Sequence, residues 1–125
     1  MTQIEMEQAY RRMVFNVIGC NQDDHTKNIE FLMDTDGLWK LSPAYDMSYA
    51  VGAHFTRQHQ MSVNGKFDDI TRADLLAFAS ANGIKDASEV IEQVCEAAIH
   101  WPEMAREVGV PEEMIKSIHR NMVTL

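Results

Sequence analysis

The sequence is poor in cysteine, in clustered basic residues and in long apolar runs. Its two cysteines, Cys20 and Cys95, lie far apart in apolar patterns and lack metal-binding spacing, which predicts buried free thiols. The net charge of −8 and the scattered lysines and arginines argue against a nucleic-acid-binding surface. No apolar run approaches the roughly 20 residues of a membrane span, and the chain does not open on a signal-peptide pattern. We therefore expect a soluble, cytoplasmic protein that binds neither membranes nor nucleic acid directly.

Glycine is too dispersed to form a glycine-rich phosphate loop. The six glycines stand at positions 19, 37, 52, 65, 83 and 109, whereas such a loop needs several glycines within a few residues. The length of 125 residues fits one domain or part of one. A chain of this size buries roughly two thirds of its unfolded surface, so a real core is possible.

Potentially reactive and metal-binding residue types are most concentrated in the polar run Asn21–Asn28, which contains Asp, His, Lys and Asn. Asp23 and Asn28 stand in an Asp-x-x-x-x-Asn pattern, the spacing of a protein-kinase catalytic loop. There the Asp accepts the proton of a hydroxyl and the Asn reaches a metal ion, so a tight loop must aim both side chains at one point. A polar turn after a helix uses the same residue types, so the spacing alone leaves both interpretations open.

A β-hairpin is predicted after this run. Residues 29–33 are apolar and strand-like, Asp36-Gly37 is a turn signal, and residues 38–41 alternate apolar with other residues. The hairpin would reverse the chain and return Asp46 to the polar run. Asp46 is therefore the candidate for the further metal-binding Asp that a kinase requires.

The two motifs Asn-x-Asp-Asp-His-x-Lys-Asn, at residues 21–28, and Leu-Ser-Pro-Ala-Tyr-Asp, at residues 41–46, resemble those of HipA-like Ser/Thr kinases. These kinases are the toxins of bacterial toxin–antitoxin pairs. The likeness continues through residues 61–72 towards the C-terminus, so residues 1–125 resemble the C-terminal kinase domain. It implies a mainly α fold with a small β-hairpin and a protein-kinase-like C-lobe, which ends in a helical bundle over residues 71–125.

The resemblance also implies roles for single residues. Asp23 is the expected catalytic Asp, and Asn28 and Asp46 are the expected Mg²⁺ ligands. Lys27 is expected to approach the transferred phosphate of ATP. The cofactors implied for the complete kinase are Mg²⁺ and ATP.

Four histidine and aspartate positions near these residues are open to more than one interpretation. Asp24 and His25 are expected to shape the loop through hydrogen bonds, although Asp24 is also a rival base that stands one residue too close to Asn28. His54 and His59 fall in an irregular segment. They are candidate metal ligands, but solvated or hydrogen-bonded histidines are the favoured interpretation.

The rest of the chain predicts helices and one further turn. An amphipathic helix is expected over residues 4–19, ending at Gly19. Asn64-Gly65 predicts the turn of a small second hairpin. Residues 71–74 read as a capping box that opens a helix through about Ala81.

Two more helices are predicted towards the C-terminus. A second capping box at Asp86–Glu89 opens a helix whose apolar face extends to Trp101, just before Pro102. The last helix begins near Pro111, which suits a first helical turn, and its apolar stripe ends at Met122.

Three functions follow from these observations. The leading one is the C-terminal catalytic portion of a HipA-like Ser/Thr kinase toxin; because an N-lobe is absent from these residues, the chain alone is expected to be inactive. The alternative is a non-catalytic binding module that holds an antitoxin or a substrate protein. A metal-dependent hydrolase using Asp23, Asp24, His25 and Asp46 would explain the acidic cluster but not its spacing.

The resemblance implies partners as well. These are a protein substrate, such as an aminoacyl-tRNA synthetase, and a helix-turn-helix antitoxin. Self-association is a further expectation if the chain exposes apolar surface.

Overall fold

The computed structural model describes residues 1–52 and 58–125, so His54 lies outside the described residues. Within them the chain forms five α-helices, one short 3-10 helix and a two-stranded antiparallel sheet. These elements are α1 Gln3–Ile18, η1 Thr26–Asn28, β1 Phe31–Met33, β2 Trp39–Leu41, α2 Arg72–Ala81, α3 Ala87–Ile99, α4 Trp101–Glu107 and α5 Glu112–Asn121. The predicted mainly α fold with a small β-hairpin is confirmed.

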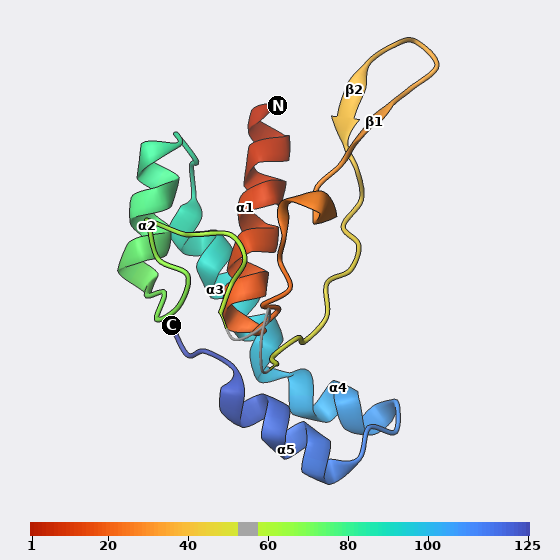
Figure 1. The fold of residues 1–125 in the computed structure, drawn as a ribbon, viewed down its shortest axis with the longest axis vertical. Helices are drawn as coiled ribbons and strands as arrows, with labels where there is room; N and C mark the ends of the chain where they lie inside the picture. Colours follow the sequence, from red (N-terminus) through yellow and green to blue (C-terminus); the bar gives the residue numbers. More distant parts are fainter. Residues whose placement is uncertain (53–57) are drawn as a thin grey trace.

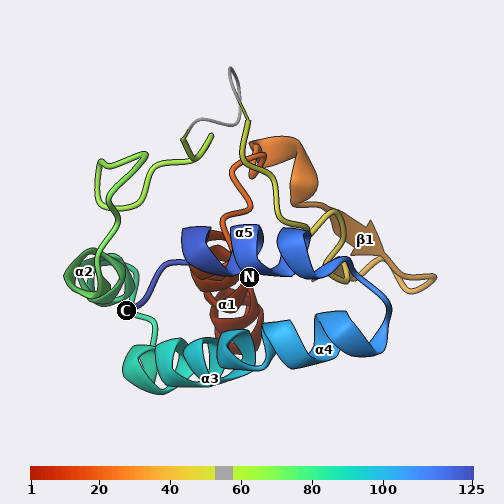
Figure 2. The same cartoon turned by 90° about the horizontal axis from the view of Figure 1, so that it is seen from below.

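Helix α1 runs through the middle of the molecule (Figure 1). Helices α2 and α3 lie along one side of it, and η1 with the hairpin β1–β2 lies along the other. The hairpin projects beyond the body at one end, and α4 and α5 form an antiparallel pair at the opposite end. Seen from that end, α5 lies in front of α1 (Figure 2). This layout separates a helical core from a loop-rich side.

Helix α1 forms where its apolar periodicity predicts. Thr2 caps it in a full capping box with Glu5, which satisfies two backbone N–H groups that would otherwise lack partners. Its buried face contains Tyr10, Val14, Val17 and Ile18. The helix ends at Gly19 as predicted, but Gly19 itself has φ −81° and the left-handed conformation falls on the next residue, Cys20, with φ 53°.

The core lies between α1, α2 and α3. Tyr10 donates from its hydroxyl to the backbone oxygen of Leu75 at 2.9 Å, and its ring stacks on Phe78 with centroids 6.4 Å apart. Burial raises the pKa of Tyr10, which keeps the hydroxyl protonated as a donor. The buried apolar residues of this core are Tyr10, Val14, Val17, Ile18, Val63, Ile70, Leu75, Ala79, Ala87, Val90, Ile91 and Val94.

The predicted capping box at the start of α2 is confirmed. Thr71 accepts from the backbone N–H of Asp74, and the Asp74 carboxylate accepts from the backbone N–H of Thr71 at 2.9 Å. The same carboxylate accepts from Asn64 Nδ2 at 3.0 Å and from Lys66 Nζ at 2.9 Å. Asp74 therefore joins the Asn64-Gly65 turn to the N-terminus of α2.

These donors hold the pKa of Asp74 well below its usual range, the Thr71 N–H being the largest cause and the side chains of Asn64 and Lys66 adding to it. Because the folded state then binds its proton less readily than the unfolded chain, Asp74 stabilises the fold above about pH 4 and this contribution is lost as the pH falls further. We expect Asp74→Asn to lower the melting temperature at pH 7, by a difference that shrinks below about pH 4. Thermal melts followed by circular dichroism between pH 7 and pH 2 measure this difference, with the exposed Asp68→Asn as control. A melting-temperature difference between Asp74→Asn and the wild type that stays constant with pH would contradict the prediction.

Two predictions for the later helices are corrected. Asp86 does not cap α3 with its side chain, because its backbone is left-handed (φ 55°, ψ 26°) rather than extended, the conformation that aims an N-cap oxygen at the first turn. The predicted long helix also ends at Ile99. Trp101 begins the separate helix α4, and Pro102 occupies its first turn instead of following a helix end.

Both predicted turns form. In the hairpin, Phe31 pairs with Leu41 and Met33 with Trp39, and Gly37 takes the positive φ of 81° that its turn requires. The second hairpin is reduced to one bridge, Val63 with Lys66, across the Asn64-Gly65 turn.

Both cysteines are free as predicted; Cys20 is buried and Cys95 half-buried. In the described part of the chain, every helix is too short or too polar to cross a bilayer.

Candidate functional site

The site begins at the sharp turn that follows α1. The left-handed backbone of Cys20 redirects the chain, and the next segment pairs with Ala50: Ala50 donates to the Cys20 oxygen at 3.0 Å and Gln22 donates to the Ala50 oxygen at 2.9 Å. Asn21 is buried and donates from Nδ2 to Asn16 Oδ1 at 2.9 Å and to the Asp46 oxygen at 3.3 Å. One side chain thus ties the polar run to both α1 and Asp46.

The polar run then closes into η1. Asn28 donates from its backbone to the His25 oxygen at 3.1 Å, and from Nδ2 to the Asp23 oxygen at 3.2 Å. Because the Asn28 nitrogen is bound to the loop itself, its side-chain oxygen remains for another partner. The Asn28 side chain thus contacts the backbone of Asp23, while the convergence of both side chains on one metal ion stays a prediction.

Helix α1 holds the hairpin that returns the chain. Glu5 accepts from the Leu41 N–H at 2.9 Å, and its pKa is lowered by the backbone N–H groups of Thr2 and Leu41. Arg12 donates from Nη2 to the oxygen of Ser42 at 2.7 Å. The segment that ends at Asp46 is therefore fixed along α1 before it reaches the polar run.

Tyr45 connects the returning segment to the polar run, because its hydroxyl donates to the Lys27 backbone oxygen at 2.7 Å. Desolvation, with the nearby carboxylates of Glu30 and Asp46, raises the pKa of Tyr45, so the hydroxyl stays a donor at neutral pH. Asp46 follows with a left-handed backbone, φ 54°, a conformation that Asp and Asn tolerate better than most other residues.

Asp23, His25 and Asp46 converge. One ligand atom from each lies within 4.8 Å of the others. In an octahedral Mg²⁺ site, with ligands at about 2.1 Å, opposite ligand atoms are about 4.2 Å apart, so a small closing movement would bring these three onto one ion. Two carboxylates and an imidazole also suit Mn²⁺. The residues present fit a divalent cation.

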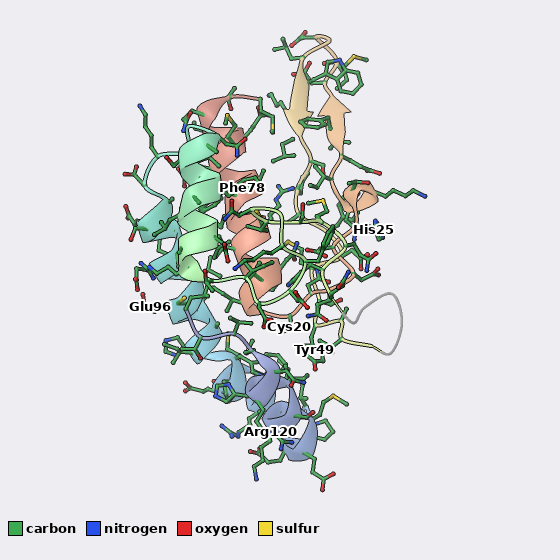
Figure 3. The ribbon with its side chains drawn as sticks, turned by 60° about the vertical axis from the view of Figure 1, so that its left-hand side comes forward. Cys20, His25, Tyr49, Phe78, Glu96 and Arg120 are labelled. Carbon is green, nitrogen blue, oxygen red and sulfur yellow. The ribbon has the colours of Figure 1, made fainter. Side chains whose placement is uncertain are left out.

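His25, Asn28 and Asp46 line one small cavity of about 40 Å³, together with Arg12 of α1. Figure 3 shows His25 on the loop side of α1, away from Phe78 of α2. Nδ1 of His25 is buried and has no hydrogen-bond partner among the described residues. Lys27, predicted to approach a phosphate, is exposed, and its backbone oxygen rather than its ammonium group contacts Tyr45.

Asp24 is buried, lines the same cavity and is held by the segment at residues 59–60. Its Oδ2 lies 2.8 Å from His59 Nδ1, and its Oδ1 accepts from the Gln60 N–H at 2.8 Å. Both side chains of the Asp24–His59 pair are more than nine-tenths buried. His59 is thus hydrogen-bonded in the structure, as the favoured interpretation of its sequence context held.

Sequence reasoning missed four contributors: Asn21, Arg12, Tyr45 and the pairing of His59 with Asp24. Asn21 and Tyr45 belong to the two motifs, so their positions were visible although their contacts were not. Arg12 and His59 carry no local signal, because each meets a segment at least 30 residues away in the sequence.

The fold and the site together define a mainly helical domain that presents a candidate divalent-cation centre on the loops around its first helix. Among protein families, the one described as HipA-like C-terminal domain matches residues 1–124. The chain belongs to this family. No curated protein and no solved structure matched the chain.

Proposed function

We propose that this chain is the C-terminal catalytic portion of a HipA-like Ser/Thr protein kinase, with the arrangement of a kinase C-lobe. The observation that carries the proposal is the convergence of Asp23, His25 and Asp46 within 4.8 Å beside the cavity lined by Asn28. Family membership supports it, because the matched region contains the Asp-x-x-x-x-Asn pattern and the later Asp. Asp23 is the proposed catalytic residue, and Asn28 and Asp46 are the proposed Mg²⁺ ligands.

Each residue has a separate task. Asp23 accepts the proton of a substrate Ser or Thr hydroxyl while that oxygen bonds to the γ-phosphorus and ADP leaves. ATP would supply the phosphoryl group, and a Mg²⁺ ion held at Asn28 and Asp46 would neutralise the charge of the phosphates. Asn28 and Asp46 orient that ion, the exposed ammonium of Lys27 approaches the phosphate, and Asp24 and His25 shape the loop. The protein substrate, such as an aminoacyl-tRNA synthetase, and a helix-turn-helix antitoxin are part of the same proposal.

The test is complementation. The chain is mixed with the nucleotide-binding N-terminal half of a HipA-like kinase, labelled ATP and a protein substrate, and phosphate incorporation is measured. We expect incorporation in the mixture, none from either half alone, and loss of incorporation in Asp23→Asn. Asp36→Asn, at the exposed tip of the hairpin, is the matched control and should retain it. Incorporation that survives Asp23→Asn would reject Asp23 as the catalytic base.

A non-catalytic binding module is the second candidate, and the hairpin favours it. Five large apolar side chains on its strands and turn are 44–65% exposed. They are Phe31, Leu32, Met33, Leu38 and Trp39. Exposed apolar patches commonly mark interaction surfaces, and self-association or antitoxin binding through this hairpin would follow. No phosphate incorporation in any mixture, together with hairpin-dependent binding, would favour this candidate.

A further inference from the structure

The pair Asp24–His59 is a buried polar contact between two loops that are distant in the sequence. The carboxylate of Asp24 has an anchor on each oxygen, the Gln60 N–H on Oδ1 and the His59 ring on Oδ2, both at 2.8 Å. The His59 backbone is itself held, because its N–H donates to the Phe67 oxygen at 2.9 Å. Asp24 is thus tied to a segment that has its own connection to the folded body.

Asp24 stands between two members of the candidate centre. Asp23 precedes it, His25 follows it, and both contribute to the three-residue cluster with Asp46. A displacement of the Asp24 backbone would therefore also move the side chains of Asp23 and His25, two of the three that converge in the cluster. A shift of about 1 Å is enough to cost a catalytic site much of its activity, so the anchor on Asp24 sets the geometry of the cluster.

We infer that His59 is a positioning residue for the candidate centre, acting through Asp24 to hold Asp23 and His25 in place. This inference rests on the proposed function. An ionised Asp24 accepts from the Gln60 N–H and requires a donor on its other oxygen, which Nδ1–H of His59 supplies. Without that donor the carboxylate is left partly unsatisfied in the interior and moves towards water, and the loop moves with it.

The experiment compares Mn²⁺ affinity, measured by electron paramagnetic resonance, in three variants. His59→Leu keeps apolar volume but removes the donor, and we expect it to weaken Mn²⁺ binding about tenfold, the lower range seen when partners of metal ligands are removed. His59→Asn places an amide N–H near the position of Nδ1 and should restore most of the affinity. Exposed His119→Leu on α5 is the control and should bind as the wild type does.

The outcomes separate the two proposals. No Mn²⁺ binding by the wild type would reject the proposed function and this inference with it. Wild-type binding with unchanged affinity in folded His59→Leu, or equal loss in His59→Leu and His59→Asn, would reject the inference alone. If His59→Leu does not fold, NMR of the wild-type protein provides the test. Mg²⁺ binding should shift the ring-nitrogen resonances of His59. Unshifted resonances in the Mg²⁺-bound protein would overturn the inference.

Discussion

Replacing Asp46 with asparagine should weaken Mn²⁺ binding by at least about tenfold, a loss at least as large as that from removing a partner of a metal ligand. The reason is the lost carboxylate charge at a cluster whose ligand atoms lie within 4.8 Å. Asparagine is the informative substitution because Asp46 has a φ of 54°, and Asn is the other side chain that tolerates this conformation. A change in affinity then reports the charge rather than backbone strain.

The matched control for Asp46→Asn is Asp69→Asn. Asp69 is also an exposed aspartate with a left-handed backbone, φ 47°, but it is not a member of the cluster. Paramagnetic broadening in NMR spectra of labelled protein gives the second readout. In the wild type, Mn²⁺ should broaden the signals of Asp23, Asn28 and Asp46 first. Equal Mn²⁺ affinity in both variants would show that Asp46 is no ligand.

The largest expected effect on stability comes from the core. Ile91 is fully buried in α3, within the cluster shared with α1 and α2. We expect Ile91→Ala to lower the free energy of unfolding by about 2–5 kcal/mol, because it loses buried methyl groups and leaves a cavity that rigid helices fill only in part. Chemical denaturation monitored by circular dichroism measures this loss.

The comparison is Ile99→Ala, the same substitution at the last residue of the same helix. Its side chain is 71% exposed, so Ile99→Ala should change the unfolding free energy by no more than about 0.5 kcal/mol. Because alanine has a higher helix propensity than isoleucine, a similar loss for both substitutions could not come from propensity, and it would contradict the view that burial between α1, α2 and α3 sets the cost at Ile91.

The features that the sequence predicted well are those decided within a few residues. The helix after Thr71 depends on a contact between Thr71 and Asp74, three positions apart. The turn at Gly37 depends on one residue that tolerates a positive φ. The failed cap at Asp86 marks the limit of such reasoning, because the connection from α2 to α3 imposes a left-handed backbone there.

For the candidate centre, the sequence predicted some of the residues but not how their side chains are arranged. The spacing of Asp23 and Asn28 and the hairpin before Asp46 are local patterns. They pointed to Asn28 and Asp46, which line the cavity, and to Asp23, which belongs to the cluster with Asp46. His25 was expected to shape the loop in the kinase interpretation and to bind a metal only in the hydrolase alternative, so the leading prediction did not include it among the ligands. A sequence pattern states which residues are near in the chain, whereas a ligand set depends on where side chains point.

The sequence by itself determined the helices, the turns and the polar run, because these follow from hydrogen bonds and apolar periodicity over a few neighbouring positions. Only the tertiary structure decided which distant segments hold that run in place. Arg12 reaches Ser42, and His59 reaches Asp24, across 30 and 35 positions. Such contacts form when packing of α1 against its neighbours brings the segments together, and no local pattern in the chain records the partner.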